Sequence, residues 1–317
     1  MIRSENLTRK YGTFTAVNRI NLNIPAGQIY GFLGPNGSGK TTTILMLLGI
    51  VRPTSGEIHL FGERATPERL DLRKRIGVVP EKHPHGVWKW MTAHDYLSMF
   101  ADLFAVRDAG ARIRHLLESS GLYGVRAERV STFSRGMLQK LSIVRALLHD
   151  PDILLLDEPI SGLDPNGIKQ VRDLILGENR EGRTIFISSH MLSEMEKICH
   201  RIAIIYRGEL MAEDDMSSLL ARLARDRRIE VELEQVPQDL AARLRQLPFV
   251  VDCETNGNCV TVSVSKEGDH RKSLSSYLIG EQLLPLRLEE KGLSLEDAFI
   301  TITEDKMQLL TAAESAL

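Results

Sequence analysis

The sequence predicts an α/β fold: a core of alternating strands and helices, with a β-rich lead-in, a helical subdomain and a small C-terminal α+β domain. Three observations carry this prediction. Short apolar segments alternate with amphipathic helical segments over residues 1–216. A glycine-rich loop, Gly34–Thr41, separates one apolar strand from the helix that follows it. After Met216 the alternation typical of half-exposed strands begins, so we expect domains at 1–216 and 217–317.

Composition and charge exclude several classes of protein. Of the 317 residues, 43% are hydrophobic and 26% charged, which is ordinary for a globular protein. A net charge of −2 predicts no large basic surface, so no nucleic-acid partner is expected. Cys199, Cys253 and Cys259 lack metal or redox spacing, and we expect buried thiols in a reducing compartment. The N-terminus has no apolar targeting segment, and no apolar run approaches the ~20 residues of a spanning helix. We therefore expect a soluble chain that reaches a membrane only through a partner.

The β-rich lead-in surrounds the glycine-rich loop. Strands are expected around Ile20–Ile24 and over Gly56–Phe61, and Tyr11 lies upstream of the loop. The strand Gln28–Leu33 leads into the loop, and the helix Thr42–Leu48 leads out and ends at Gly49.

The loop fits G-x-x-x-x-G-K-[ST] at every position, and each residue type has a physical reason. Its residues are Gly34, Pro35, Asn36, Gly37, Ser38, Gly39, Lys40 and Thr41, followed by Thr42. A phosphate chain can lie against backbone N–H groups only where no Cβ blocks its approach, which explains the glycines. Lys40 supplies a cation for the β- and γ-phosphates, and the Thr41 hydroxyl can bind Mg²⁺. The helix N-terminus adds partial positive charge.

A helical subdomain is expected over residues of about 82–150. It follows a buried strand, Arg75–Pro80, and the acidic residue Glu81. Thr92 is a good N-cap for a first helix, and Ile113, Leu116 and Leu117 lie on one face of a second. Trp88 and Trp90 stand just before these helices; they are either core residues or part of an exposed surface for a partner.

The chain then returns to the α/β core. Ser134-Arg135-Gly136 opens a helix, and Ile153–Leu156 forms a short buried strand that runs directly into Asp157 and Glu158. Carboxylates at the end of such a strand must be solvated, paired or bound to a metal. The remaining elements are a helix (165–178), a strand (Thr184–Ser188), His190, a helix (Leu192–Cys199) and a strand (Arg201–Tyr206).

The C-terminal domain has no catalytic constellation in its sequence. A half-exposed strand, Ile229–Leu233, precedes an amphipathic helix, Asp239–Leu247, and Asn256-Gly257 signals a hairpin between the strands that flank it. A helix (273–282), a strand (Leu286–Leu288) and a last helix from Ser294 follow. Sensing a ligand, reinforcing a dimer and contacting a membrane partner remain open as roles of this domain.

These residues together resemble the ATP-binding subunit of an ABC transporter, in an ordered set that spans residues 1–215. The loop resembles Walker A, Ile153–Glu158 resembles Walker B, and Ser161–Asp164 resembles the D-loop. Ser188–His190 resembles the switch-histidine region, and 133–137 occupies the signature position. The resemblance implies a P-loop NTPase cassette with a RecA-like core, an antiparallel β lead-in and a helical subdomain, with ATP and Mg²⁺ as cofactors.

The resemblance also implies a role for each matching residue. Tyr11 resembles the aromatic residue that stacks on adenine, and Asp157 the residue that holds Mg²⁺, often through water. Glu158 resembles the general base that polarises the attacking water, and His190 the residue that contacts the γ-phosphate. Lys40 would neutralise charge during phosphoryl transfer.

Two positions depart from the usual family pattern. Of the signature Leu-Ser-Gly-Gly-Gln only Ser134 and Gly136 are kept, whereas Arg135 and Met137 are replacements, as is Phe133. Ser134 and Gly136 supply a hydroxyl and an unobstructed amide at a helix N-terminus. Glu81 stands where glutamine is usual, and its carboxylate offers Mg²⁺ a stronger ligand while repelling the γ-phosphate more.

Both variants resemble the exporter-type (ABC-2 type) branch, in which the membrane domains are separate chains. The residues 294–299 also resemble the close of the C-terminal domain found in that branch. The resemblance implies a homodimer in which each ATP lies between Walker A of one copy and the signature, Ser134–Met137, of the other. Asp164 of the D-loop region is expected at the same nucleotide site. It further implies integral membrane permease subunits, to which residues near 82–104 transmit motion, and a place at the cytoplasmic face of the membrane.

Three rival interpretations stay open at this point: a soluble ABC ATPase that acts on ribosomes or DNA, an importer ATPase, and a regulatory cassette without activity. The single cassette without coiled-coil insertion argues against the first, and the altered signature argues against the second. The intact Lys40, Asp157, Glu158 and His190 argue against the third. His83 and His85 form a His-x-His beside Glu81, for which exposed loop histidines are the simpler interpretation than a metal site.

Overall fold

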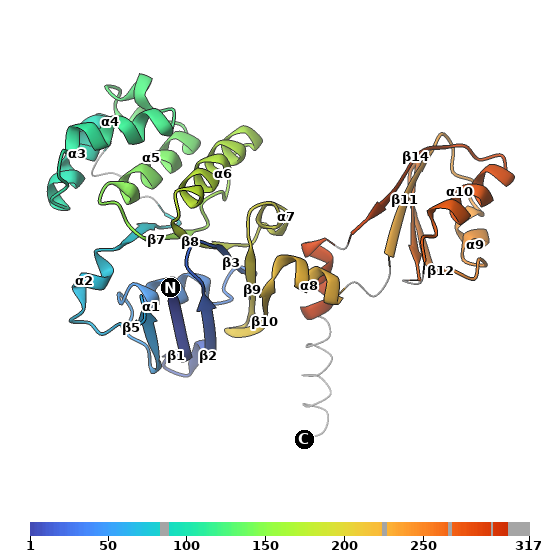
Figure 1. The fold of residues 1–317 in the computed structure, drawn as a ribbon, viewed down its shortest axis with the longest axis horizontal. Helices are drawn as coiled ribbons and strands as arrows, with labels where there is room; N and C mark the ends of the chain where they lie inside the picture. Colours follow the sequence, from blue (N-terminus) through green and yellow to red (C-terminus); the bar gives the residue numbers. More distant parts are fainter. Residues whose placement is uncertain (83–88, 224–226, 266–267, 293, 304–317) are drawn as a thin grey trace. The chain divides into compact units, whose positions relative to one another are not determined.

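The computed structural model describes residues 1–82, 89–223, 227–265, 268–292 and 294–303. The chain divides into two compact units, Met1–Met216 and Ser217–Leu317. Figure 1 shows both units, coloured along the sequence. His83, His85 and Trp88 lie outside the described residues.

The first unit is built on a six-stranded sheet in the order β10-β9-β3-β8-β7-β6. Every neighbouring pair is parallel except β10 with β9. The strands are β3 (Ile29–Leu33), β6 (Ile76–Val79), β7 (Ile153–Asp157), β8 (Thr184–Ser189), β9 (Arg201–Tyr206) and β10 (Glu209–Asp215). All residues of β3, β7 and β8 are buried, because helices or a second sheet cover both faces of a parallel sheet.

A second sheet of this unit is antiparallel, in the order β2-β1-β4-β5. Its strands are β1 (Ile2–Tyr11), β2 (Phe14–Ile24), β4 (Ser55–Leu60) and β5 (Glu63–Arg64). Ile20 and Leu60 of this sheet share one buried core with Phe32 and Phe186 of the parallel sheet and with Met46 of α1 (Lys40–Leu47). The helix after the glycine-rich loop is therefore held between the two sheets.

The remaining helices of the first unit include the helical subdomain. Figure 1 shows α3, α4 and α5 gathered beside α6. The helices are α2 (Leu70–Arg73), α3 (Ala93–Leu103), α4 (Ala109–Ser119), α5 (Arg135–Leu147), α6 (Pro165–Arg180) and α7 (Leu192–Glu196), with 3-10 turns at Tyr123–Val125 and Val130–Thr132. Thr92 caps α3, and its side chain accepts a hydrogen bond from the Asp95 amide at 3.1 Å. Ser134 caps α5 in the same way.

The second unit has the element order β-α-β-β-α-β, which is the ferredoxin-like arrangement. Helix α8 (Met216–Leu223) precedes these six elements, which are β11 (Arg227–Leu233), α9 (Leu240–Leu244), β12 (Val250–Asn256), β13 (Cys259–Val264), α10 (Arg271–Gly280) and β14 (Pro285–Lys291). A helix begins at Leu295. The four strands form one antiparallel sheet. The predicted hairpin joins β12 to β13, but its loop is Gly257-Asn258, because Asn256 still pairs with Cys259; Gly257 has a φ of 59°.

The predicted α/β fold is confirmed, with a few corrections. Strand β10 had no prediction, because its residues Glu209–Asp215 are only half-buried and lack an apolar alternation. The helix predicted over Leu192–Cys199 ends at Glu196. Cys199 and Cys253 are buried, but Cys259 is only half-buried, because it lies on the face of β13 opposite Val260 and the core. Trp90 is 68% exposed, which excludes a core role for it.

Candidate active site

The site residues meet where three parallel strands end. In the sheet register Leu33 of β3 lies opposite Ser189 of β8, and Asp157 of β7 lies opposite Ser188. The carboxyl ends of β3, β7 and β8 therefore share one edge of the sheet, which is where α/β folds bind ligands. A cavity of about 460 Å³ lies here. It is lined by Tyr11, Phe14, Ala16, Asn36, Gly37, Gly39, Lys40, Thr41, Thr42, Glu81, Glu158, Ser161 and His190.

The glycine-rich loop is packed so closely that side chains are excluded at two of its positions. A Cβ at Gly34 would lie 2.2 Å from the carbonyl oxygen of Ile205, and one at Gly39 would lie 2.6 Å from that of Ala16. Gly37 and Gly39 adopt φ values of 79° and 109°, which L side chains rarely adopt. The loop keeps its backbone exposed to the cavity because its opposite side is packed against β9 and β2.

Gly34, Pro35 and Ser38 support the loop rather than line the cavity. The Gly34 amide donates to the Ser189 carbonyl at 3.2 Å, and the Ser38 carbonyl accepts from the Gly208 amide at 2.9 Å. The Pro35 carbonyl accepts from the Ser38 amide at 3.2 Å. These bonds tie the loop to β8 and to the β9–β10 turn.

Lys40 begins helix α1 and turns back over the loop. Its ammonium group donates to the carbonyl oxygens of Gly34 at 2.8 Å and Pro35 at 3.2 Å. It also lies 3.1 Å from Oε1 of Glu158, and the two side chains are only 6% and 7% exposed. A buried cation is therefore held by two carbonyls and a carboxylate at the inner end of the cavity.

Glu158 lies one residue beyond β7, in a left-handed backbone conformation with φ of 50°. Its amide donates to Ser188, to Oγ at 3.0 Å and to the carbonyl at 3.2 Å. Its Oε2 lies 2.8 Å from Nδ1 of His190, whose side chain is 41% exposed. The carboxylate is thus fixed between Lys40 and His190, and the strained backbone that aims it is held by β8.

Asp157 and Ser188 form a buried pair beneath these residues in the sheet. The Ser188 hydroxyl donates to Oδ1 of Asp157 at 2.5 Å, and Asp157 is 4% exposed. Asp157 is not among the residues that line the cavity. One carboxylate oxygen is therefore engaged by Ser188, which fixes the orientation of the other.

The donors available to a metal are oxygens. Thr41 and Glu81 both line the cavity. Asp157 does not, but it directly precedes Glu158, which does. A hydroxyl and two carboxylates suit Mg²⁺, which keeps several waters and takes few protein ligands. Within the described residues no group of three or more His, Cys, Asp or Glu side chains is placed to hold a metal ion.

The signature residues lie apart from this cavity. Ser134, Gly136 and Met137 line neither it nor the neighbouring one, and the Ser134 hydroxyl accepts from the Met137 amide at 3.3 Å. Arg135 lines the neighbouring cavity with Glu81, Glu158 and others, and its guanidinium covers Gly162, where a Cβ would lie 2.2 Å from Nη1. Asp164 caps α6 by accepting from the Gly167 amide at 3.0 Å. The chain's own phosphate loop and signature serine are thus not in one cavity.

Tyr11 stands at the other end of the cavity, in the β1–β2 turn opposite Phe14. The two rings are 45% and 62% exposed. The guanidinium carbon of Arg9 lies 4.3 Å from the centre of the Tyr11 ring. An exposed aromatic surface next to a phosphate loop offers a place for a flat base to stack.

Three lining residues and one supporting residue had no assigned role in the sequence prediction. Phe14, Ala16 and Ser161 line the cavity, and Ser188 contacts both acidic residues. The sequence signals available were the alternation of Phe14 and Ala16 in a strand and the pairing of Ser188 with Ser189 before His190. Neither pattern shows that these side chains reach the site, because that depends on the sheet register.

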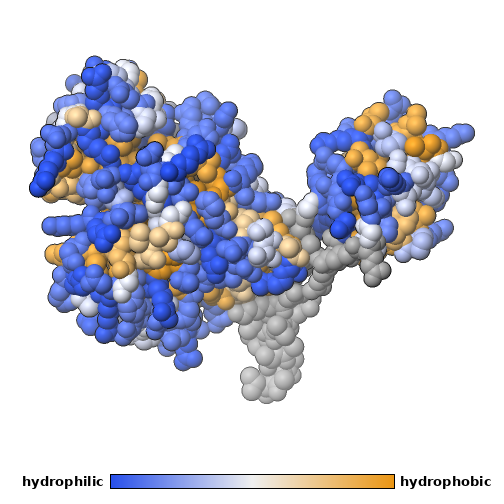
Figure 2. Space-filling view, viewed as in Figure 1, coloured by the Kyte–Doolittle hydropathy of each residue, from blue (hydrophilic) through white to orange (hydrophobic). Residues whose placement is uncertain are grey.

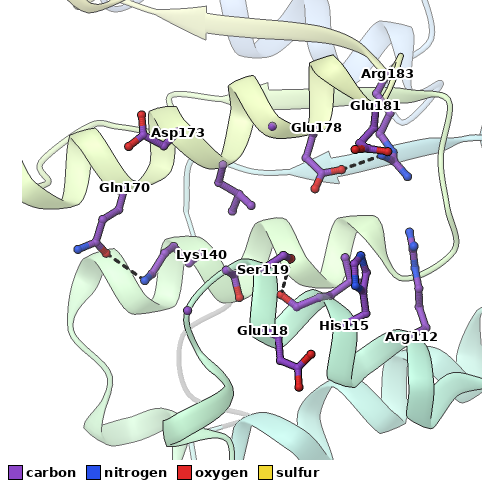
Figure 3. A pocket seen from close by; sticks show the side chains of 15 residues that line it. Arg112, His115, Glu118, Ser119, Lys140, Gln170, Asp173, Glu178, Glu181 and Arg183 are labelled. Atoms are coloured by element: carbon purple, nitrogen blue, oxygen red, sulfur yellow. Dashed lines mark hydrogen bonds and ion pairs between the residues drawn. The ribbon is translucent and has the colours of Figure 1, made fainter.

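The largest cavity described is elsewhere in the first unit. It measures about 770 Å³ and lies among α4, α5 and α6, as Figure 3 shows. Both acidic and basic side chains line it, and Lys140 donates to Oε1 of Gln170 at 3.0 Å. Burial lowers the pKa of Lys140. No residue of the glycine-rich loop lines this larger cavity.

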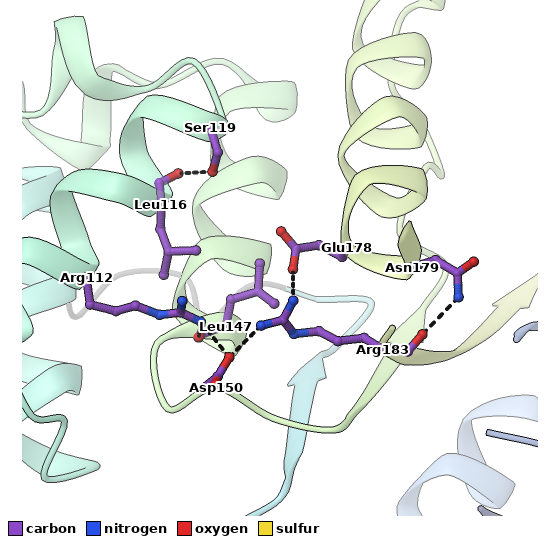
Figure 4. A network of polar contacts seen from close by, with 8 residues as sticks. All are labelled: Arg112, Leu116, Ser119, Leu147, Asp150, Glu178, Asn179 and Arg183. Atoms are coloured by element: carbon purple, nitrogen blue, oxygen red, sulfur yellow. Dashed lines mark hydrogen bonds and ion pairs between the residues drawn. The ribbon is translucent and has the colours of Figure 1, made fainter. Parts of the chain in front are cut away.

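An ion-pair network joins the helical subdomain to the core near this larger cavity. Figure 4 shows Asp150 between Arg112 of α4 and Arg183 of the α6–β8 connection. Asp150 Oδ1 accepts from these arginines at 3.0 Å and 2.5 Å, and Arg183 also donates to Glu178 at 2.9 Å. Burial raises the pKa of Glu178, against the opposing effect of Arg183. The network ties α4 to α6 through Asp150, which lies in the connection between α5 and β7.

Comparison with known proteins gives likenesses over both units. A family model described as ABC transporter matches residues 17–161. The chain is 38% identical over 304 residues to the bacitracin transport ATP-binding protein BcrA of Bacillus licheniformis, covering 95% of this chain and 97% of that protein. It is 32% identical to the Nod factor export ATP-binding protein I of Paraburkholderia xenovorans, covering 97% and 98%.

Solved structures give the same picture of the fold. A dimeric ATP-binding cassette in a post-hydrolysis state, bound to ADP and phosphate, matches with a TM-score of 0.61. The identity is 24%, and the match covers 68% of this chain and 99% of that one.

Proposed function

Because the chain belongs to the ATP-binding proteins of ABC transporters, in their exporter-type branch, we propose the following cycle for it. Two copies bind ATP with Mg²⁺ between them and hydrolyse it. The resulting closure and release drive a separate membrane permease. One observation carries the proposal: Glu158 is held between Lys40 and His190 in a cavity walled by the phosphate loop.

Glu158 is the proposed general base. Its carboxylate is nearly buried yet reaches the cavity, and its backbone is fixed by two hydrogen bonds to Ser188. A base in this position polarises the water that attacks the γ-phosphate. His190 contacts the same carboxylate from the exposed side, so it can exchange that contact for one with the γ-phosphate.

Lys40 and the loop amides are the proposed phosphate site. Lys40 now contacts Glu158, so arrival of the γ-phosphate gives the ammonium group a second anion and frees Glu158 to face the water. Thr41, Glu81 and Asp157 are the proposed Mg²⁺ ligands, Asp157 through water because it does not line the cavity. When bound, Mg²⁺ neutralises charge on the phosphate oxygens. Tyr11 is the proposed adenine platform.

The second site half comes from a second copy. Ser134 and the Gly136 amide lie at the start of a 13-residue helix, and a Cβ at Gly136 would have no neighbour closer than 3.7 Å. The unobstructed N-terminus of this helix, with a hydroxyl and a nearby guanidinium, suits a phosphate. Ser134 and Gly136 do not line the phosphate-loop cavity of their own chain. In the proposed homodimer Ser134–Met137 of one copy closes over the nucleotide of the other, with Asp164 at the same interface. A cassette of this fold that is dimeric with ADP and phosphate gives a precedent.

The proposed partners are integral membrane permease subunits, and the proposed location is the cytoplasmic face of the membrane. No helix in the described part of the chain is long and apolar enough to cross a bilayer. The names of the two relatives that this chain matches along almost their whole length describe one as a transport protein and the other as an export protein. Exposed apolar residues Trp90, Leu103 and Phe104 in the helical subdomain give a permease a surface to contact.

The test is ATP hydrolysis by the purified chain reconstituted with the permease. We expect Mg²⁺-dependent hydrolysis that Glu158→Gln slows by about 10²–10⁴-fold while ATP still binds. Hydrolysis near the parent rate in this variant would remove Glu158 from the proposed mechanism. Hydrolysis that the permease never alters would remove the coupling.

A further inference from the structure

The sheet of the C-terminal unit has two outer strands with different chemistry. Its order is β12-β13-β11-β14, so among the described residues β12 and β14 each pair on one side only. One face of the sheet packs on α9 and α10 through residues such as Val231, Val262 and Leu288. Because side chains alternate along a strand, Asp252 and Glu254 of β12 and Arg287 and Glu289 of β14 lie on the opposite face, whereas Glu290 lies on the face of Leu288.

Exposed apolar side chains lie on β14, just before it and on α10, the helix that contacts it. Leu286 on the strand is 60% exposed, Leu284 just before it is 72% exposed, and Ile279 of α10 is 53% exposed. Figure 2 shows hydrophobic residues reaching the visible surface of this unit. An outer strand with apolar neighbours is a template for pairing with another strand.

Two charges of β14 flank its middle residue symmetrically, whereas Glu290 and Lys291 have Leu286 and Pro285 as their counterparts. The strand runs from Pro285 to Lys291, so Leu288 is its midpoint. Arg287 and Glu289 flank Leu288, and they form an ion pair with each other at 2.7 Å. If two such strands pair antiparallel over their full length, Leu288 faces Leu288 and each Arg287 faces the Glu289 of the other copy.

The other outer strand, β12, carries charges of the same sign on either side of its middle residue. The charges on the equivalent face of β12 are Asp252 and Glu254, both acidic. In any antiparallel pairing of β12 with its own copy that brings these residues opposite one another, acid meets acid, which is unfavourable. Of the two edges, β14 is the one in which the charges flanking the middle residue are of opposite sign.

We propose that β14 of one chain pairs antiparallel with β14 of a second copy about an axis at Leu288, which joins the two C-terminal sheets into one. The pairing satisfies the outer backbone groups of both strands. It places Leu286 beside Glu290 of the other copy, whose carboxylate is already paired with Arg227. It needs no nucleotide, so it is separate from the ATP-dependent dimer proposed above. It would hold two chains together between rounds of hydrolysis.

The test uses sedimentation of the full-length chain without nucleotide or Mg²⁺, over a concentration series. These conditions exclude the ATP sandwich, so failure here is distinct from failure of the proposed ATPase dimer. Interfaces below about 1,200 Å² are weak, so we expect a reversible monomer–dimer equilibrium. Arg287→Glu makes the two strands repel each other, and so does Glu289→Arg. Each change should weaken the dimer by roughly tenfold or more, because two attractive cross-strand pairs become repulsive.

Two rescue experiments separate pairing from a folding defect. A mixture of the two single variants should form a heterodimer, because every Glu then faces an Arg. The double variant Arg287→Glu/Glu289→Arg should restore the homodimer. The control Arg245→Glu/Asp252→Arg reverses an ion pair at the β12 edge and should leave the equilibrium unchanged.

The proposal is overturned if the parent chain stays monomeric at every concentration, or if the single variants dimerise like the parent. It is also overturned if the mixture fails to associate while circular dichroism shows both variants folded. The chain could also be monomeric alone while the amides of β14 become protected from hydrogen exchange when the permease is added. That result would show that this edge binds the permease, and it would contradict the proposal.

Discussion

The ammonium group of Lys40 lies 3.1 Å from Oε1 of Glu158, so the cation of the phosphate loop and the proposed base are in direct contact. Both side chains are nearly buried, and His190 contacts the other oxygen of the same carboxylate. The pair therefore links phosphate binding to the placement of the base. Any change of charge at Glu158 should alter hydrolysis much more than the binding of ATP.

Glu158→Gln should bind Mg-ATP at least as tightly as the parent but hydrolyse it roughly 10²–10⁴-fold more slowly, the usual contribution of a positioned base. The amide keeps the shape of the side chain, cannot accept a proton, and no longer repels the γ-phosphate. Single-turnover hydrolysis and equilibrium binding of a fluorescent ATP analogue measure the two effects. Glu57→Gln, which alters an exposed carboxylate paired with Arg64, is the control and should behave like the parent. A parallel loss of binding and hydrolysis would contradict the assignment.

Ser188→Ala should weaken Mg²⁺ activation by about 10–100-fold, the usual effect of removing a group that orients a ligand. Its hydroxyl donates to Asp157 and accepts from the Glu158 amide, so the change loosens both acidic residues. The Mg²⁺ concentration for half-maximal hydrolysis is the measurement. Ser189→Ala is a matched control: Ser189 is equally buried, but its hydroxyl accepts from the Met191 amide. Equal effects of the two substitutions would show that burial, rather than the contact with Asp157, is responsible.

Glu178→Gln should change how stability depends on pH. Burial raises the pKa of Glu178, so the folded chain keeps this proton to higher pH than the unfolded chain does. The carboxyl therefore lowers stability as pH rises through that range, and glutamine removes the effect. The melting temperature of the variant relative to the parent should rise between about pH 4 and about pH 7. Glu128→Gln changes an exposed carboxyl and should show no such trend; a falling difference for Glu178→Gln would mean that Arg183 outweighs burial.

The three cysteines should differ in their rates of alkylation. Burial raises the pKa of the Cys199 and Cys253 thiols, which leaves little of the reactive thiolate, whereas Cys259 is half-buried. Brief treatment of the native chain with iodoacetamide should therefore modify Cys259 first, as read by peptide mass spectrometry. Unfolding in guanidinium should remove the difference. Modification of Cys199 ahead of Cys259 in native protein would contradict the described burial.

The sequence was informative wherever a local pattern has one structural meaning. The glycine-rich loop must follow a strand and open a helix, and α1 does begin at Lys40. Thr92 and Ser134 were recognisable as helix caps from their residue type and the apolar periodicity that follows. Apolar runs such as Ile153–Leu156 have few alternatives to a buried strand.

The sequence was uninformative where position depends on tertiary packing. Ser188 reaches Asp157 because β7 and β8 pair in a register that a sequence pattern does not reveal. The half-buried strand β10 owes its place to pairing with β9 rather than to its own alternation. The contact of Arg135 with Gly162 joins residues 27 positions apart through the approach of α5 to the β7–α6 loop.

The placement of one copy's signature over the other copy's nucleotide is tested most directly by cross-linking. In a cysteine-free background, one chain carries Asn36→Cys, the other Ser134→Cys, and both carry Glu158→Gln. Asn36 lines the phosphate cavity, whereas Ser134 does not line that cavity in its own chain. We predict a cross-linked product joining the two differently marked chains that forms with Mg-ATP and not without nucleotide. If no such product forms under conditions where ATP is bound and the permease is present, the signature of one copy does not face the nucleotide of the other.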